Sequence, residues 1–358
     1  MTIDTAMGPD AQGLILLCST LGLARDGKPL SAAEWKAVAP AIERAGMRPG
    51  DLLGLSVGDT ARALSIPTTL ATRMVELLAR GGQLALELQR LQARGIWVCT
   101  RVDDDYPKRF RTRLKAQSPA VLCGAGPLPA ADAPALAIVG SRDVDDTGLA
   151  FTRRAGAACA RAGVTVVSGG ARGVDITAQE AALDAGGRVC AVLADSLEKA
   201  LQKRALREAV REGRLTLMTA VHPSTPFSAG IAMARNKFIY ALSSAAVVVA
   251  SAEGTGGTWA GATEDLERGW VPLFVRDGMD APAGNRALVA RGAHAIAEDD
   301  EAVAQLVRAA VDGDAPTYHA AAQPAPTPAH VAESSAPSYG RNTVVESPTP
   351  VAPGKLFD

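Results

Sequence analysis

The most informative segment of this chain for its architecture is Val166-Val167-Ser168-Gly169-Gly170-Ala171-Arg172-Gly173-Val174-Asp175. An apolar run typical of a buried strand ends here, two adjacent glycines allow a tight turn, and an arginine and an aspartate precede a predicted helix. At such a junction, backbone N–H groups and the positive end of the helix dipole point at one place. The segment therefore predicts an anion site, and the nearby arginines indicate that the anion is a phosphate.

Three further segments place glycines or cations near the ends of apolar runs: Ile138–Arg142, Ala234–Lys237 and Glu253–Thr258. Ligands of sheets built from strand–helix units bind at the carboxyl ends of the strands, so we expect these segments to serve one ligand. The candidate phosphate-binding residues are Gly140, Ser141, Arg142, Ser168, Gly169, Gly170, Arg172, Gly173, Arg235, Asn236, Lys237, Gly256, Gly257 and Thr258.

Some of these candidates also have a purely structural interpretation. Arg142 can hold a phosphate through two N–H groups, or it can pair on the surface with Asp143 or Asp145. Arg235-Asn236-Lys237 is predicted to open a helix, where its cations either grip an anion or are simply solvated. Asp175 lies where a helix N-cap is wanted, so we expect a structural cap that accepts N–H bonds of the following turn.

The composition excludes several classes of protein. The chain has 358 residues, 47% of them apolar, and a formal net charge of −1, which permits a local basic groove but no basic coat. Its five cysteines are scattered without a Cys-x-x-Cys pair, and only four histidines are present, so we expect reduced thiols and no metal site. No secretory signal and no membrane span are predicted, and we expect a cytoplasmic protein.

Residues 1–94 are predicted to form a small all-α domain. Ser31 and Glu34 form a capping-box pattern, and Thr69–Arg94 is predicted to be one longer amphipathic helical run. The turn at Arg48–Asp51 suits a helix-hairpin-helix that binds DNA, and it suits equally a packing or dimerisation domain without DNA contact.

From residue 95 the hydrophobic pattern changes to short continuous apolar runs, which are typical of strands buried on both faces of a parallel sheet. The predicted strands are Ile96–Thr100, Ala120–Cys123, Ala135–Val139, Val164–Val167, Val189–Leu193, Leu215–Met218, Ala245–Val249 and Val271–Val275. Predicted helices separate several of them: Gly148–Ala162, Ile176–Ala185, Leu197–Arg211, Phe238–Leu242 and Trp259–Glu267. We therefore expect an α/β, doubly wound, mostly parallel sheet over residues 95–312.

Residues 313–358 are rich in Ala, Pro, Ser and Thr and lack apolar periodicity, so we expect a disordered tail. Its last residues, Pro353–Asp358, suit either a short docking peptide or a solvated terminus.

The chain lacks a recognisable catalytic constellation. No Gly-Lys-Ser/Thr follows the glycines of Glu253–Thr258, and no dinucleotide fingerprint is present, so no cofactor is expected. His222 and His294 are interpreted as ordinary polar or packing residues. Binding is therefore expected rather than enzyme activity.

Six segments within residues 95–297 resemble, in order, the motifs of the DNA-processing protein A (DprA/Smf) family. They are Tyr106-Pro107, Ala137–Arg142, Ser168–Leu183, Arg235–Ser243, Gly256–Thr258 with Gly261-Ala262, and Asn285–Ala293. The resemblance implies an extended Rossmann-like core that binds single-stranded DNA cooperatively and loads the RecA recombinase, in natural transformation or related DNA processing. It also implies a homodimer.

By motif position, Arg142 and Arg172 match the family's DNA-gripping basic residues, and Arg235 and Asn236 belong to the same pocket. Such groups hold phosphates without reading sequence. Aromatic residues make up only 4% of the chain, so base stacking is expected to be limited.

The chain departs from the family pattern at several positions. Gln179 replaces the usual histidine, Lys237 the second arginine and Gly261 a threonine, and no C-terminal winged helix is expected. A divergent paralogue in phage defence or plasmid processing fits these departures. A nucleotide or nucleotide-signal sensor is a second interpretation, while a nucleotide-phosphate glycosidase is disfavoured because Glu264 comes too late after the glycines.

Overall fold

The computed structural model describes residues 7–24, 27–129 and 133–313, so almost all of the expected tail lies outside the described residues. Five helices come first: α1 (Pro9–Cys18), α2 (Ala32–Arg44), α3 (Val57–Leu64), α4 (Thr68–Leu78) and α5 (Gly81–Gln92). They belong to the same compact unit as the sheet that follows, and the division at residues 94/95 stays a prediction.

The helical segment confirms one local prediction and corrects another. Ser31 caps α2 as a capping box: its hydroxyl accepts from the Glu34 N–H at 3.2 Å, and its own N–H donates to the Glu34 carboxylate at 2.7 Å. The single run predicted over Thr69–Arg94 is wrong, because α4 and α5 are separate helices. Arg80 lies at the break and donates to the Leu77 carbonyl at 3.0 Å.

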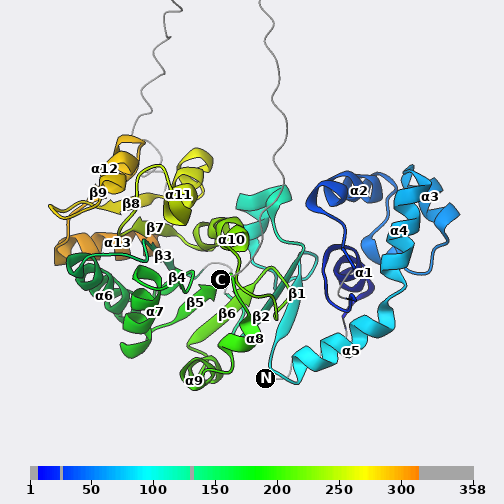
Figure 1. Cartoon of the computed structure of the whole chain (residues 1–358), viewed down its shortest axis with the longest axis horizontal. Coiled ribbons are helices and arrows are strands. Elements are labelled where there is room, and N and C mark those ends of the chain that lie inside the picture. The colour runs from blue at the N-terminus through cyan, green and yellow to red at the C-terminus, as the bar shows by residue number, and fades with distance from the viewer. Residues whose placement is uncertain (1–6, 25–26, 130–132, 314–358) are drawn as a thin grey trace, which may run out of the picture. The chain divides into compact units, whose positions relative to one another are not determined.

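The remaining chain forms one nine-stranded sheet with the order β1-β2-β6-β5-β4-β3-β7-β8-β9 (Figure 1). Strands β3 to β9 pair in parallel, while β1 and β2 are antiparallel to their neighbours. The strands are β1 (Trp97–Thr100), β2 (Val121–Ala125), β3 (Ala135–Val139), β4 (Thr165–Ser168), β5 (Val189–Val192), β6 (Leu215–Thr219), β7 (Ala245–Val248), β8 (Leu273–Arg276) and β9 (His294–Ile296). The α/β fold with a mostly parallel sheet is thus confirmed.

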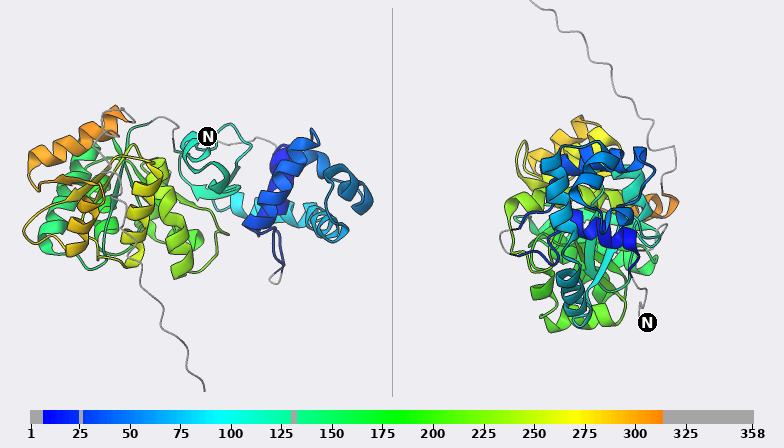
Figure 2. Two further views of the ribbon diagram at one scale, coloured as in Figure 1. Left: turned by 90° about the horizontal axis from the view of Figure 1, so that it is seen from above. Right: turned by 90° about the vertical axis from the view of Figure 1, so that its right-hand side faces the viewer.

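In the described residues after α5, eight α-helices accompany the sheet, and they cover both of its faces. They are α6 (Asp146–Arg161), α7 (Val174–Asp184), α8 (Leu197–Ala200), α9 (Arg204–Arg211), α10 (Ala229–Leu242), α11 (Gly256–Arg268), α12 (Ala283–Ala290) and α13 (Asp300–Asp312). Side chains of a strand alternate between the faces, so Leu136 and Ile138 of β3 join one core with α6, α7 and α13. Ala137 and Val139 join a second core with α10, α11 and α12. The ribbon in Figure 2 shows helices on both sides of the sheet.

Every predicted strand occurs, with ends shifted by no more than two residues, but several helices differ from the prediction. Arg235-Asn236-Lys237 does not open a helix: α10 begins six residues earlier, where the Ser228 hydroxyl accepts from the Ile231 N–H at 3.1 Å. Because glycine is a poor helix former, Gly230 in the first turn makes this helix start hard to predict from the sequence. The helix predicted over Leu197–Arg211 is two helices, α8 and α9.

Candidate functional site

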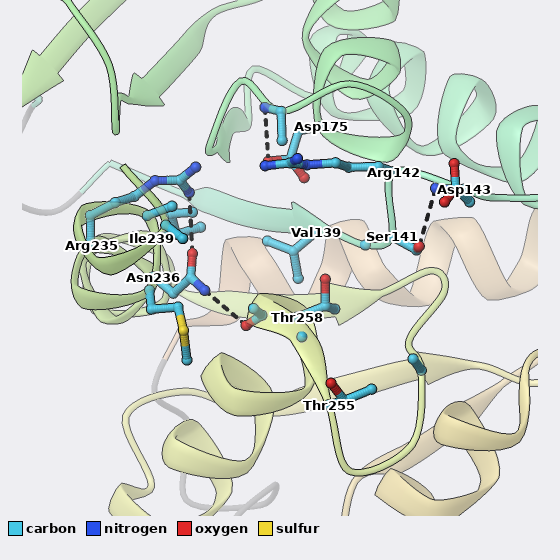
Figure 3. A pocket seen from close by; sticks show the side chains of 18 of the residues that line it. Val139, Ser141, Arg142, Asp143, Asp175, Arg235, Asn236, Ile239, Thr255 and Thr258 are labelled. Carbon is cyan, nitrogen blue, oxygen red and sulfur yellow. Dashed lines mark hydrogen bonds between the residues drawn. The ribbon is translucent and has the colours of Figure 1, made fainter. Parts of the chain in front are cut away.

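A pocket of about 510 Å³ lies at the carboxyl ends of β3, β4 and β7, which is the edge where the sequence places its glycine turns. Loops that follow these strands meet α10 there (Figure 3). We call it the strand-end pocket. The residues that line it include Gly140, Ser141, Arg142, Asp175, Phe227, Met233, Arg235, Asn236, Tyr240, Thr255, Gly256, Gly257 and Thr258.

The loop after β3 carries an exposed arginine on an anchored backbone. The Ser141 N–H donates to the Ala250 carbonyl at 2.8 Å, which ties the loop to the end of β7. Arg142 is exposed, with its guanidinium 5.6 Å from the centre of the Phe227 ring. The surface pair expected as an alternative is not formed, because no carboxylate of the described ranges pairs with Arg142. The Arg142 guanidinium therefore keeps its N–H groups for a ligand.

A second arginine lies deep in the strand-end pocket. Arg235, on α10, is only 8% exposed and donates to the Gly169 carbonyl at 2.9 Å. Its guanidinium lies directly over Gly169, where a Cβ would come within 1.8 Å of Nη1, so only glycine leaves room for the arginine. Its Nε–H, although buried, has no hydrogen-bond partner among the described residues. Such a donor is costly to leave unpaired, and a ligand or a water would satisfy it.

Asp175 compensates the charge of Arg235. Both side chains are buried, and burial raises the pKa of Asp175 while the positive charge of Arg235 opposes that rise. Burial likewise lowers the pKa of Arg235, against the opposing charge of Asp175. The two opposite charges therefore offset part of the cost of burying each other.

The predicted role of Asp175 as a helix N-cap is wrong. The N-cap of α7 is Gly173, and Asp175 is the second residue of the helix. Its carboxylate points back to the preceding loop and accepts the Gly169 N–H at 3.1 Å and the Ala171 N–H at 3.3 Å. These two N–H groups are therefore engaged within the protein and cannot cradle a phosphate. The Gly169-Gly170 turn instead holds Arg235 through the Gly169 carbonyl and is itself held by Asp175.

The N-terminus of α11 brings a further set of backbone amides to the strand-end pocket. Thr255 is its N-cap and makes no side-chain cap bond, so the first-turn N–H groups of Gly256, Gly257 and Thr258 meet the pocket without an intrahelical partner. The Asn236 amide donates to the Gly257 carbonyl at 2.8 Å and fixes this turn against α10. A helix of 13 residues presents the positive end of its dipole here, which favours an anion.

The structure thus separates the predicted site residues into two sets. Eight of them line the strand-end pocket: Gly140, Ser141, Arg142, Arg235, Asn236, Gly256, Gly257 and Thr258. The other six do not: Ser168, Gly169, Gly170, Arg172, Gly173 and Lys237. Arg172 is exposed and 3.6 Å from Asp143, and the Lys237 ammonium donates to Gln117 at 3.1 Å. Direct ligand contact by these six residues stays a prediction.

Sequence reasoning missed the apolar wall of the strand-end pocket. Phe227, Met233, Ile239 and Tyr240 all line it. The phenol of Tyr240 is buried and, like the Arg235 Nε–H, has no hydrogen-bond partner in the described part of the chain. Gly230 interrupts the helical pattern before Arg235, so the sequence gives no reason to place Phe227 at the same edge. The start of α10 at Ala229 is what brings Phe227 to this edge of the sheet.

Features of a metal centre or a membrane span do not occur in the described part of the chain. Residues 7–24, 27–129 and 133–313 contain no group of three His, Cys, Asp or Glu side chains able to hold a metal ion. Over the same ranges, every helix is too short or too polar to span a bilayer. Arginines, backbone amides and apolar side chains are among the groups that line the strand-end pocket.

Comparison with known proteins places these features in a family. The sequence profile of DNA recombination-mediator protein A matches residues 97–307, which contain the whole sheet and the strand-end pocket. This chain belongs to that family. The DprA/Smf resemblance of the sequence motifs is thereby confirmed.

Individual relatives agree with the family. The DNA processing protein DprA of Mycobacterium tuberculosis is 31% identical over 235 residues, which cover 61% of this chain and 59% of that protein. Protein Smf of Synechocystis is 31% identical over 176 residues, or 48% of this chain and 44% of that protein. The chain therefore spans less than two thirds of the length of the curated relatives that it matches.

A solved structure shows the same fold. The X-ray structure of DNA processing protein A from Streptococcus pneumoniae superposes with a TM-score of 0.61 at 20% sequence identity, covering 82% of this chain and 97% of that one. The Rossmann-like fold expected from the sequence is thus confirmed.

Proposed function

We propose that this protein binds single-stranded DNA through backbone phosphates at the strand-end pocket. The observation that carries the proposal is the convergence of an unpaired exposed arginine, Arg142, a buried arginine, Arg235, and the open N-terminus of α11. On a chain of net charge −1, this local concentration of donors favours a phosphate ligand. Membership of a DNA recombination-mediator family supports nucleic acid as its source.

The proposed activity is binding and not catalysis. The pocket offers N–H donors and apolar surface, but it holds no nucleophile with a paired base among its lining residues. Phosphate contacts of this kind fix a strand without reading its sequence. We extend the proposal to a cytoplasmic homodimer that helps to load the RecA recombinase, in transformation or related DNA processing. Of these features, the family name supports a part in DNA recombination.

A mononucleotide sensor is the second candidate function. The strand-end pocket, at about 510 Å³, falls within the range of roughly 300–1,000 Å³ that is usual for small-ligand sites. Calorimetry with mononucleotides and with oligothymidylate separates the two functions. Tight binding of a mononucleotide with weak binding of the oligonucleotide would favour the sensor.

The DNA proposal predicts a specific effect of Arg142→Ala. Because the arginine is exposed and unpaired, its loss should leave folding intact and weaken oligothymidylate binding about tenfold at low salt. The slope of log affinity against log salt should also become shallower by about one phosphate contact. Fluorescence anisotropy of a labelled oligonucleotide over a salt series measures both quantities.

Arg204→Ala is the matched control for this experiment. Arg204 is an exposed arginine of α9 that pairs with Glu208 at 2.8 Å and does not line the strand-end pocket. Its replacement should change neither the affinity nor the salt slope. If wild type and Arg142→Ala have equal affinities, equal salt slopes and unchanged melting curves, Arg142 does not contact the DNA and the proposal is contradicted.

A further inference from the structure

Two large apolar side chains stand exposed beside the phosphate-binding donors. Phe227 and Met233 are each 53% exposed, and both line the strand-end pocket. Only seven large apolar side chains of the described residues are exposed, and two of them meet at this one pocket. Exposed apolar side chains that gather beside a pocket, rather than lie scattered singly, mark a binding surface.

Folding alone gives little reason for a phenylalanine at position 227. Ser228 is the N-cap of α10, so Phe227 precedes the cap, a place where an apolar residue commonly packs against the fourth helical residue. That fourth residue is Ala232, whose methyl group is too small to cover a phenyl ring. The Ser228 hydroxyl caps the helix by its own bond to the Ile231 N–H. The start of α10 therefore does not depend on the ring.

The ring lies next to the exposed arginine of the pocket. The guanidinium of Arg142 is 5.6 Å from the centre of the Phe227 ring, which is a cation–π contact. A phosphate bound by Arg142 would therefore lie close to the Phe227 ring. Consecutive phosphates of a single strand carry unpaired bases, and such bases stack on aromatic rings whatever their sequence.

We propose that Phe227 is a stacking surface for one nucleobase of the bound strand, next to the phosphate held by Arg142. Met233, flexible and polarisable, lies on the same wall and adapts to bases of different size. The inference rests on the proposed function. It makes the strand-end pocket a site for a phosphate and a base together, although aromatic residues are only 4% of the chain.

The test compares a normal oligothymidylate with an abasic oligonucleotide of equal length and charge. Phe227→Ala should weaken oligothymidylate binding about fivefold or more, because one stacked base is lost. The same variant should bind the abasic strand as the wild type does. Phe227→Trp should retain oligothymidylate affinity, and its added indole fluorescence should be quenched by the normal strand alone.

Met279→Ala is the control variant, since Met279 is 98% exposed and does not line the strand-end pocket. This variant should bind both the oligothymidylate and the abasic strand with the affinity of the wild type. If the wild type binds neither strand, the proposed function itself fails, and the inference with it. If the wild type binds oligothymidylate and Phe227→Ala binds it equally well, the inference alone is overturned. An equal loss on both strands also overturns it, because the ring would then act only by positioning Arg142.

Discussion

Replacing Gly173 by alanine is expected to destabilise the protein by about 3 kcal/mol and to weaken DNA binding by about tenfold or more. Gly173 has φ +86° and ψ −127°, a backbone conformation that side-chain-bearing residues rarely adopt. A Cβ there would lie 2.6 Å from the Ser141 carbonyl oxygen and 2.7 Å from that of Arg142. Because those contacts are backbone atoms, the loop that carries Arg142 must move. Urea unfolding and oligothymidylate anisotropy measure the two losses.

Gly230→Ala is the matched control for that substitution. Gly230 lies inside the first turn of α10, with nothing within 4 Å of the place of a Cβ. Alanine there should keep DNA binding and raise the free energy of unfolding by up to about 1 kcal/mol. If Gly173→Ala unfolds within about 0.5 kcal/mol of the wild type and binds DNA normally, the close approach of the two loops is not required.

Replacing Arg276 by methionine is expected to cost about 3–5 kcal/mol of stability. The Arg276 side chain is fully buried and donates at 2.7 Å to each of two carboxylates, Asp145 and Glu298. It also donates to the Val249 carbonyl at 2.9 Å, which joins β8 to the end of β7. Methionine fills part of the space but leaves both carboxylates without their cation. Urea denaturation gives the change in the free energy of unfolding.

Arg308→Met serves as the surface comparison. Arg308 pairs with Glu301 at 2.6 Å on exposed α13 side chains, and such a pair contributes no more than about 1 kcal/mol. A similar loss in the two variants would show that the buried network contributes no more than a surface pair.

The same network predicts a pH dependence. Burial alone would raise the pKa of Asp145, but the Gly148 N–H and the Arg276 charge lower it on balance. A carboxyl whose folded pKa is depressed stabilises the fold above its unfolded pKa of about 3.9 and loses that stabilisation as pH falls through the folded pKa. Arg276→Met removes part of this contribution. The free energy of unfolding of this variant should therefore fall less steeply than that of the wild type below about pH 4.

Much of the fold could be predicted from sequence because buried parallel strands leave a strong pattern. Runs such as Val189–Val192 and Ala245–Val248 are apolar throughout, since both faces of the sheet are covered. The strand β9 was missed because His294–Ile296 is only three residues long and contains a histidine. The first turns of α10 could not be predicted because Gly230 interrupts the helical pattern there, although its later residues, Phe238–Leu242, were predicted as a helix.

The site was predicted in part, and the misses have a geometric origin. Strand ends in a parallel sheet meet at one edge, so Gly140–Arg142 could be assigned to the pocket from sequence. The direction of the Asp175 carboxylate could not be predicted from the sequence. An aspartate that caps the helix and one that faces the preceding loop differ only in the residue at which the helix begins. Lys237 does not line the pocket because of its position on α10, and its contact with a ligand stays a prediction. Two residues along a helix point about 200° apart, so Arg235 and Lys237 cannot both face one pocket.

The strand-end pocket is assembled from loops that are far apart along the chain, after β3, β4 and β7, together with α10. No single segment of the denatured chain reproduces that arrangement. A ligand that recognises it therefore binds the native state alone and raises the free energy of unfolding by RT ln(1 + [L]/Kd). Thermal melting then becomes an affinity assay for this protein, and a rise in Tm on adding an unlabelled strand would report occupancy without any engineered probe.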